Sequence, residues 1–219
     1  MEKLSLSLIF ASFLCFLVSC DGSESPQFTV VYSEFDFEVR LYNESSWMSA
    51  PVRGISFEKA TREGFHRIFQ YIEGGNLNSS KIRMTTPVLT SIVPEAGPLH
   101  SSAYVVRFYL PAEIQTTPPV PLPELNLQLD ARGHMCVAVR KFSGFARDGN
   151  IVKEAEKLAV SLSRSPWANS TMTQSKDSYS IAQYDSPFRL IGRLNEVWVD
   201  VAGSARNGCG FSRVRVSTY

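Results

Sequence analysis

Residues 81–93 read Lys-Ile-Arg-Met-Thr-Thr-Pro-Val-Leu-Thr-Ser-Ile-Val, and the fold class follows from this stretch. Its content of Ile, Val, Thr and Met is typical of a β-strand, so a strand is predicted over the whole of 81–93. Because proline has no N–H to give to a sheet ladder, Pro87 predicts an edge, a bend or a bulge in the middle of that strand.

Similar runs of strand and helix patterns occur twice along the chain, which indicates a weak internal repeat. In the first half the strand patterns and the helix pattern lie at 37–42, 81–93 and 103–110 and at about 56–73. In the second half they lie at 135–139, 179–184 and 196–201 and at about 151–163. Ser56 is the expected N-cap of the first helix, Gly74-Gly75 its expected stop, and Asp148 or Asn150 the expected cap of the second. The predicted class is therefore α+β: a distorted antiparallel β-barrel of two strand-helix-strand-strand halves, with one helix on each side.

Length and composition agree with a single domain. The chain has 219 residues, 44% of them hydrophobic, which is enough for one sizeable core or for two halves of one. Five prolines between Pro111 and Pro123 predict a stiff connector rather than a domain boundary, since neither half has enough core alone. The formal net charge of +1, without a long block of one sign, disfavours a nucleic-acid partner.

The first twenty residues have the layout of a secretory signal peptide. Lys3 is followed by an apolar run from Leu4 to Val18, then by small residues, and cleavage is expected after Cys20 or Gly22. An uncleaved anchor is the alternative. No later stretch is long enough for a membrane helix. The expected location is the secretory pathway, with the protein extracellular or in another endomembrane-derived compartment.

This location changes how later residues are interpreted. Asn43, Asn78 and Asn169 each begin an N-glycosylation sequon at a predicted turn. Cys136 and Cys209 are the cysteines left after residue 20, and in an oxidising compartment they can pair in a disulfide. Two separate thiols are the equally weighted alternative.

The first predicted helix carries two stripes of side chains at helical spacing. Its core stripe is Phe57, Ala60, Gly64, Ile68 and Ile72. A neighbouring stripe holds Arg62, Phe65, His66 and Phe69, which suits a flat apolar ligand with acidic edges. The alternative is that the two phenylalanines widen the core while Arg62 and His66 face water. The second helix shows one ordinary apolar stripe, at Val152, Ala155, Leu158, Ala159 and Leu162.

Two motifs in this order and spacing resemble the SOUL haem-binding family. They are Met84-Thr-Thr-Pro-Val88 and, near the C-terminus, Arg193-Leu-Asn-Glu-Val-Trp198. The resemblance covers 28–202 and implies one haem-binding domain, with halves of about 28–110 and 126–202 related by a pseudo-twofold axis. Outside it lies a Gly- and Arg-rich tail at 203–219, in which 211–216 either adds an edge strand or stays loose.

The resemblance also implies a binding surface. It places Arg62, Phe65 and Phe69 of the first helix against a porphyrin macrocycle, with Tyr184 and Arg189 approaching from the last hairpin and both arginines near the propionates. Gln70 departs from relatives that have lysine there. His66 is the first candidate for an axial metal ligand, ahead of His100 and His134, while Met84 is interpreted as core filler. No Cys-x-x-Cys-His motif occurs, so attachment is expected to be non-covalent.

The predicted function is reversible binding of haem or protoporphyrin by a carrier, buffer or sensor. Motifs of common hydrolases and nucleotide-binding enzymes do not occur, so no enzymatic activity is expected. The alternative is a non-enzymatic effector-binding or protein-interaction module on the same scaffold, with a different hydrophobic ligand. Convergence of Arg62, Phe65, Phe69 and Arg189 on one open cleft would favour the tetrapyrrole.

Overall fold

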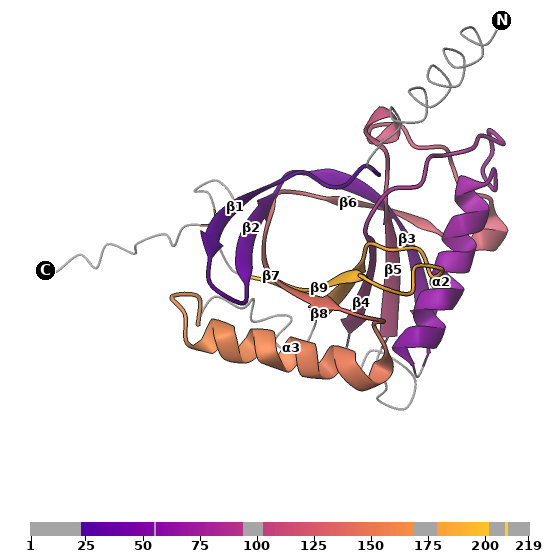
Figure 1. Ribbon diagram of the computed structural model, residues 1–219. Helices are drawn as coiled ribbons and strands as arrows, with labels where there is room; N and C mark the ends of the chain where they lie inside the picture. The colour runs from indigo at the N-terminus through magenta and orange to yellow at the C-terminus, as the bar shows by residue number, and fades with distance from the viewer. Residues whose placement is uncertain (1–22, 55, 94–102, 169–178, 202–208, 210–219) are drawn as a thin grey trace, which may run out of the picture.

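A computed structural model describes residues 23–54, 56–93, 103–168, 179–201 and 209. Within these residues nine strands form one antiparallel sheet that curls into a half-barrel, and two long helices lie on its outer side (Figure 1). The strands are β1 Phe28–Ser33, β2 Glu38–Tyr42, β3 Ser45–Arg53, β4 Val88–Val93, β5 Ala103–Tyr109, β6 Gln128–Arg132, β7 Met135–Ser143, β8 Tyr179–Gln183 and β9 Leu194–Asp200. The helices are α2 Phe57–Ile72 and α3 Asp148–Ser163, with short 3-10 turns η3 Ala112–Ile114 and η4 Pro123–Leu125 in the proline-rich connector.

The order of elements agrees with an α+β repeat. The segments β2-β3-α2-β4-β5 and β6-β7-α3-β8-β9 each contain two strands, a helix and two strands. In space the strand order is β1-β2-β7-β9-β8-β4-β5-β3-β6. Strands of the two halves pair with each other at three places, β2 with β7, β8 with β4 and β3 with β6, so both halves share one curled sheet. The pseudo-twofold relation between the halves stays a prediction.

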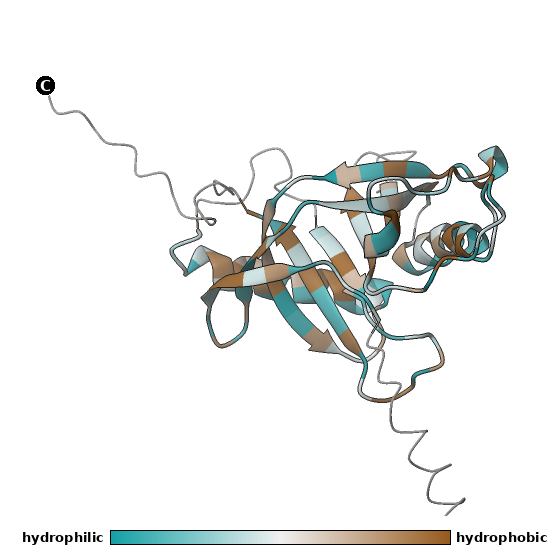
Figure 2. Ribbon diagram, turned by 90° about the horizontal axis from the view of Figure 1, so that it is seen from above, coloured by the Kyte–Doolittle hydropathy of each residue, from teal (hydrophilic) through white to brown (hydrophobic). Residues whose placement is uncertain are grey.

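The curled sheet has two buried faces. The outer face packs against α2 over β3 and β5 and against α3 over β7 and β9, and forms the larger core cluster. The inner face holds a second cluster with several large aromatic rings, among them Tyr42, Trp47 and Trp198. Because neighbouring residues of a strand point to opposite faces, apolar and polar residues alternate along much of the sheet (Figure 2).

The prediction for α2 is confirmed. Ser56 is its N-cap and its side chain accepts a hydrogen bond from the Lys59 N–H, and all five residues of the predicted core stripe are buried. Gly64 permits the close approach to the sheet, since a Cβ built there would lie 2.4 Å from Cγ2 of Val106. The helix ends at Ile72 with Glu73 as its C-cap, and Gly74 follows at φ +111°.

The prediction for α3 needs two corrections. The helix begins at Asp148, with Arg147 as N-cap, and Asn150 accepts the hydrogen bond from the Arg147 N–H. Its buried residues are Ile151, Leu158 and Leu162, whereas the predicted stripe members Val152 and Ala159 are exposed. The helix therefore turns Ile151 rather than Val152 towards the sheet, and Ile151, Leu158 and Leu162 follow one another at the seven- and four-residue steps of a single helical face.

The strand prediction at 81–93 was too long. Strand β4 begins only at Val88, directly after a cis Thr86–Pro87 peptide bond, and 81–87 has no strand structure. Three strands, β1, β3 and β6, were not predicted. Strand β3 could not be recognised from alternating hydrophobicity, because it is buried on both faces. Its neighbouring residues Trp47, Met48, Ser49 and Ala50 are all buried.

A disulfide joins Cys136 in β7 to Cys209. Of the three sequon asparagines, Asn43 and Asn78 are exposed, and Asn169 lies outside the described residues. The predicted signal peptide, His100 and the possible edge strand at 211–216 also lie outside them. Glycosylation and signal cleavage therefore stay predictions.

Candidate functional site

An open cleft of about 470 Å³ lies beside the N-terminal half of α2. Four segments line it: α2 itself, residues 84–88 at the start of β4, Ala146 shortly before α3, and the end of β8 with the loop that follows. Its lining is mostly apolar and consists of Phe57, Glu58, Thr61, Arg62, Phe65, Met84, Thr85, Thr86, Val88, Ala146, Gln183, Tyr184, Asp185, Ser186, Pro187 and Arg193. A cleft with an apolar wall and a few polar groups is the usual form of a small-molecule site.

The α2 wall presents one aromatic ring and one cation. Phe65 is partly buried and lines the cleft two helical turns after Phe57. Arg62 is exposed at the rim, and within the described residues it makes no ion pair or hydrogen bond. Thr61 anchors the helix to β4 through a 3.0 Å hydrogen bond to Thr90. An unpaired guanidinium above an apolar wall is suited to a ligand carboxylate.

The segment before β4 contributes Met84, whose interpretation as core filler was wrong. This side chain is 43% exposed and lines the cleft. The backbone there is held by the N-terminal segment: the Ser23 hydroxyl donates to the Met84 carbonyl at 3.0 Å, and the Thr86 N–H donates to the Glu24 carbonyl at 2.8 Å. A flexible thioether on a fixed backbone can adapt to the face of a planar ligand.

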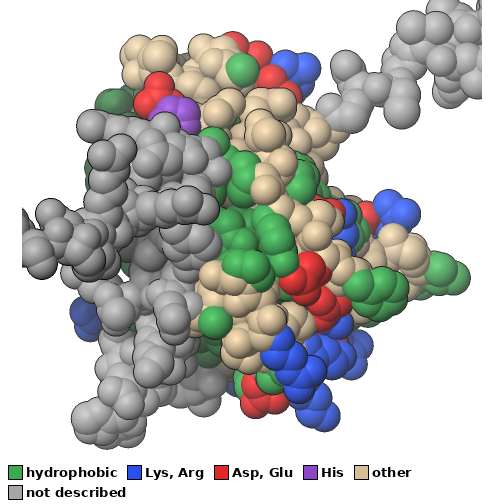
Figure 3. Space-filling model, turned by 90° about the vertical axis from the view of Figure 1, so that its left-hand side faces the viewer, with side chains coloured by type: hydrophobic (Ala, Val, Ile, Leu, Met, Phe, Trp, Pro, Cys, Tyr) green, Lys and Arg blue, Asp and Glu red, His purple; other side chains and the backbone are tan. Residues whose placement is uncertain are grey.

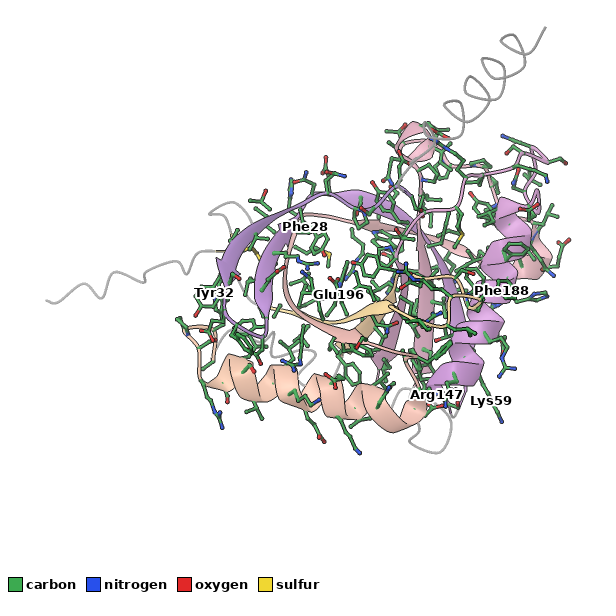
Figure 4. All side chains as sticks on the ribbon, in the orientation of Figure 1. Phe28, Tyr32, Lys59, Arg147, Phe188 and Glu196 are labelled. Atoms are coloured by element: carbon green, nitrogen blue, oxygen red, sulfur yellow. A yellow bond between two sulfur atoms is a disulfide. The ribbon has the colours of Figure 1, made fainter. Side chains whose placement is uncertain are left out.

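Tyr184 joins the cleft to the interior of the half-barrel. Its hydroxyl donates to Oε2 of Glu196 at 2.7 Å, and burial together with the charge of this carboxylate raises the pKa of Tyr184 well above its usual range. Glu196, which lies inside the half-barrel in Figure 4, also accepts hydrogen bonds from Arg40 and from Trp198. The phenol is therefore protonated and fixed in position, with its ring at the cleft wall.

Arg193 is a cleft residue to which no role was assigned from the sequence. It is only 5% exposed and donates hydrogen bonds to the backbone carbonyls of Asp185, Ser186 and Arg189, while its guanidinium lies over the Phe145 ring at 4.4 Å. Among the described residues no carboxylate forms an ion pair with it, and its Nε has no hydrogen-bond partner. The result is a buried positive charge at the wall, which favours an anionic group in the cleft. Arg193 belongs to the Arg193–Trp198 motif, so the sequence marked this position, but a motif does not say which of its residues face a cavity.

The predicted site residues divide into two groups. Arg62, Phe65 and Tyr184 come together in the cleft, whereas Phe69, His66 and Arg189 do not line it. Phe69 is 45% exposed, with its ring centroid 6.1 Å from that of Phe65 further along the same helix.

His66 and Arg189 are both engaged elsewhere. His66 is exposed on the outer side of α2, with Nε2 3.1 Å from the amide nitrogen of Gln70. Arg189 forms an ion pair with Asp185 at 2.7 Å. The described residues contain no group of three or more His, Cys, Asp or Glu side chains that could hold a metal.

Comparison with known families is decisive for the classification. The family model described as SOUL heme-binding protein matches residues 23–200, which covers most of the chain. This chain belongs to the SOUL family. The match begins and ends close to the limits of the described half-barrel, so the SOUL domain and the curled sheet with its two helices are the same unit.

SOUL relatives with curated names extend the comparison. The chain is 34% identical to Heme-binding protein 2 of Homo sapiens over 163 residues, which is 74% of this chain and 77% of that protein. It is 30% identical to Heme-binding protein 1 of Xenopus laevis over 162 residues, with 74% and 82% covered.

Two solved structures share the fold at low identity. The C-terminal domain of EcmrR has a TM-score of 0.53 at 10% identity, covering 78% of this chain and 98% of that one. An uncharacterized conserved protein from Listeria innocua has a TM-score of 0.52 at 9% identity, covering 76% and 92%. The SOUL fold is thus also present in proteins of distant sequence. Among the described residues, neither helix is long and apolar enough to cross a bilayer.

Proposed function

We propose that this protein binds haem or another tetrapyrrole reversibly and non-covalently in the α2 cleft, as a carrier, buffer or sensor in the secretory pathway and without catalysis. The observation that carries the proposal is an open, mostly apolar cleft with an unpaired arginine at its rim and an uncompensated arginine in its wall. The family membership and the names of the relatives support the ligand class.

The residues present fit a porphyrin. A porphyrin has a flat apolar face, which the Phe65 ring, the Met84 thioether and Val88 can contact. It also carries two carboxylates at one edge, for which Arg62 is the available cation at the rim. The buried positive charge of Arg193 also attracts the carboxylates at this edge of the porphyrin. Because the cleft is open, part of a macrocycle would remain in contact with solvent.

Axial ligation contributes little in this proposal. Haem iron is usually held by His, Met, Cys or Tyr, and of these types the cleft lining contains Met84 and Tyr184. The Tyr184 hydroxyl already donates to Glu196, and His66 lies outside the lining. Contacts with the plane and the carboxylates would therefore hold the ligand, and the metal-free protoporphyrin should bind as well as haem does.

A secretory location agrees with three features. Residues 1–20 have the pattern of a signal peptide, Asn43 and Asn78 are exposed sequons, and Cys136 is joined to Cys209. Structural disulfides are rare where glutathione keeps thiols reduced.

Spectroscopic titration tests the proposal. Haemin and protoporphyrin should each give saturable Soret changes with one site per chain. Phe65→Ala should weaken both affinities about 10- to 100-fold, because a buried aromatic contact contributes about 1.5–3 kcal/mol. Phe69→Ala, one turn further along and outside the cleft, should change them less than threefold.

Removing the charge of Arg62 is the second part of this binding test. Arg62→Gln should weaken binding about fivefold at low salt and less at high salt, as expected for an exposed ion pair. Lys153→Gln is the matched control, because Lys153 is an exposed cation on α3 outside the cleft lining and its replacement should have no effect. Equal losses for Phe65→Ala and Phe69→Ala would move the ligand to the outer stripe of α2, where His66 is the available ligand. No binding of either tetrapyrrole would favour the alternative, an effector-binding module for a different hydrophobic ligand.

A further inference from the structure

The loop between β8 and β9 presents large apolar side chains to solvent. Phe188 is 88% exposed, Leu190 73% and Ile191 88%. In Figure 3 hydrophobic side chains project from the right-hand edge of the molecule, at the height of this loop, and Figure 4 shows Phe188 in front of α2. Single exposed apolar residues are ordinary, but three within four positions at one tip indicate an interaction surface.

The backbone of this loop is held in place by hydrogen bonds and an ion pair. Arg193 donates hydrogen bonds to three backbone carbonyls of the loop, two of them at 2.7 Å. Asp185 spans the base of the loop: one carboxylate oxygen pairs with Arg189 at 2.7 Å and the other accepts the Leu194 N–H at 2.6 Å. These contacts fix the backbone in a shape that holds the apolar side chains away from the core.

A ligand in the cleft does not account for them. Ser186 and Pro187 line the cleft, but Phe188, Leu190 and Ile191 do not. The loop therefore has one side towards the cleft and a separate apolar tip that faces outwards.

We propose that this tip inserts into the surface of a phospholipid bilayer. The tip is convex, and three side chains offer roughly 500 Å², less than the roughly 800 Å² per partner of a stable protein interface. A bilayer needs no matching pocket, and it accepts isolated apolar side chains at the level of the acyl boundary. Arg189, 58% exposed between the apolar residues, adds the apolar stem of its side chain to the tip, while its charged end is neutralised by Asp185 at the base of the loop.

Docking in this way would set the cleft beside the membrane surface. Ser186 and Pro187 connect the cleft to the tip within two residues of Phe188, so a hydrophobic ligand could pass between bilayer and cleft with little exposure to water. This consequence rests on the proposed function, whereas insertion of the tip does not.

Vesicle flotation tests the insertion. The protein, in the form that a secretory host produces, is mixed with phosphatidylcholine vesicles, with or without phosphatidylserine. Phe188→Ser and Ile191→Ser should each lower the partition coefficient tenfold or more. Phe35→Ser is the matched control, because Phe35 is fully exposed, in the turn between β1 and β2. Figure 4 shows Tyr32, at the end of β1 next to this turn, on the opposite side of the molecule from Phe188. All variants keep the same N-terminal segment, so its contribution cancels.

Three results would overturn the proposal. One is wild-type protein that does not float with either vesicle. Another is an equal loss for Phe35→Ser, and the third is a dimer in solution that Phe188→Ser dissociates, which would assign the tip to a second copy. Haemin titration of Phe188→Ser separates the two proposals: unchanged haemin affinity with lost flotation supports both. If the protein binds no tetrapyrrole but its flotation still depends on Phe188, the membrane-inserting tip would stand and only the proposed function would be refuted.

Discussion

Replacing Arg40 by methionine tests how the inner face of the half-barrel is held together. Arg40 and Glu196 are both 2% exposed, and their side chains form two hydrogen bonds, of 3.1 and 3.0 Å. Methionine keeps most of the apolar stem of arginine but removes its charge and its donors. The change therefore leaves the Glu196 carboxylate buried, with Tyr184 and Trp198 as its remaining donors.

The expected loss is about 3 kcal/mol of unfolding free energy. Removing one partner of a buried ion pair typically costs about 3–5 kcal/mol, and the two remaining donors to Glu196 place this case at the lower end. Glu196→Gln alone should cost less, about 1–2 kcal/mol, because Arg40 keeps a 2.9 Å ion pair with Glu38. In the double variant the two charges disappear together, while the amide oxygen introduced at position 196 remains an acceptor. The loss in the double variant should therefore be smaller than the sum of the single losses by at least about 1 kcal/mol.

Urea unfolding followed by circular dichroism and tryptophan fluorescence measures all three variants. Arg53→Met is the control, because Arg53 is an exposed arginine of β3 and should tolerate the change within about 0.5 kcal/mol. Losses that simply add in the double variant would refute the idea that Arg40 is retained to neutralise Glu196. A haemin affinity lowered in Arg40→Met in the absence of urea would further show that the network positions Tyr184 at the cleft wall.

Three other changes test the scaffold. Gly64→Ala would ordinarily stabilise a helix by about 1 kcal/mol, but the new Cβ meets Val106 and should instead lower the unfolding free energy by about 1–3 kcal/mol, measured by urea unfolding. Cys136→Ser and Cys209→Ser should each lose up to about 4 kcal/mol, since the bond closes a 73-residue separation; equal melting temperatures with and without reductant would contradict this. Burial alone would raise the pKa of Asp148, but hydrogen bonds from the N-terminus of α2 outweigh it and lower the pKa. The stabilisation from Asp148 is thus present above its unfolded pKa of about 4 and lost as the pH falls through the folded value. Asp148→Ala should cost about 1 kcal/mol at pH 7 and nothing at the acid end of a pH series of thermal melts.

The sequence predicts the first helix well and the sheet less completely. Helix α2 has a local cap at Ser56, an unbroken core stripe and a glycine stop, all visible within one segment. Strand β3 depends on long-range burial on both faces, and β6 is a short polar edge strand whose pairing with β3 alone defines it. Asp148 shows the same limit: it was expected to cap its own helix, but its carboxylate instead accepts the Phe57 N–H at 2.6 Å.

Helical periodicity predicted only the α2 side of the cleft, and Tyr184 on the opposite side was predicted from the family resemblance. Periodicity places Arg62, Phe65, His66 and Phe69 on neighbouring stripes of α2, but it cannot say where the sheet edge ends and the cleft begins. That boundary depends on Met84, which lines the cleft because the chain before β4 is fixed by hydrogen bonds to residues 23–24. Such contacts join segments some sixty residues apart, and no local pattern encodes them.

The residues of the Arg193–Trp198 motif have mainly structural roles in this chain. In the Arg193–Trp198 motif, Arg193 fixes the loop carbonyls, Asn195 donates to the Gly144 carbonyl at 2.7 Å, and Glu196 gathers the buried donors, including the Trp198 indole at 2.8 Å. The motif thus fixes a hairpin that places Tyr184 at the cleft and the apolar tip in solvent. The proposed ligand contacts of Arg62 and Phe65 come from outside it, on α2. Substitutions in the motif should therefore lower stability and affinity together, whereas substitutions at Arg62 or Phe65 should change affinity at nearly constant stability.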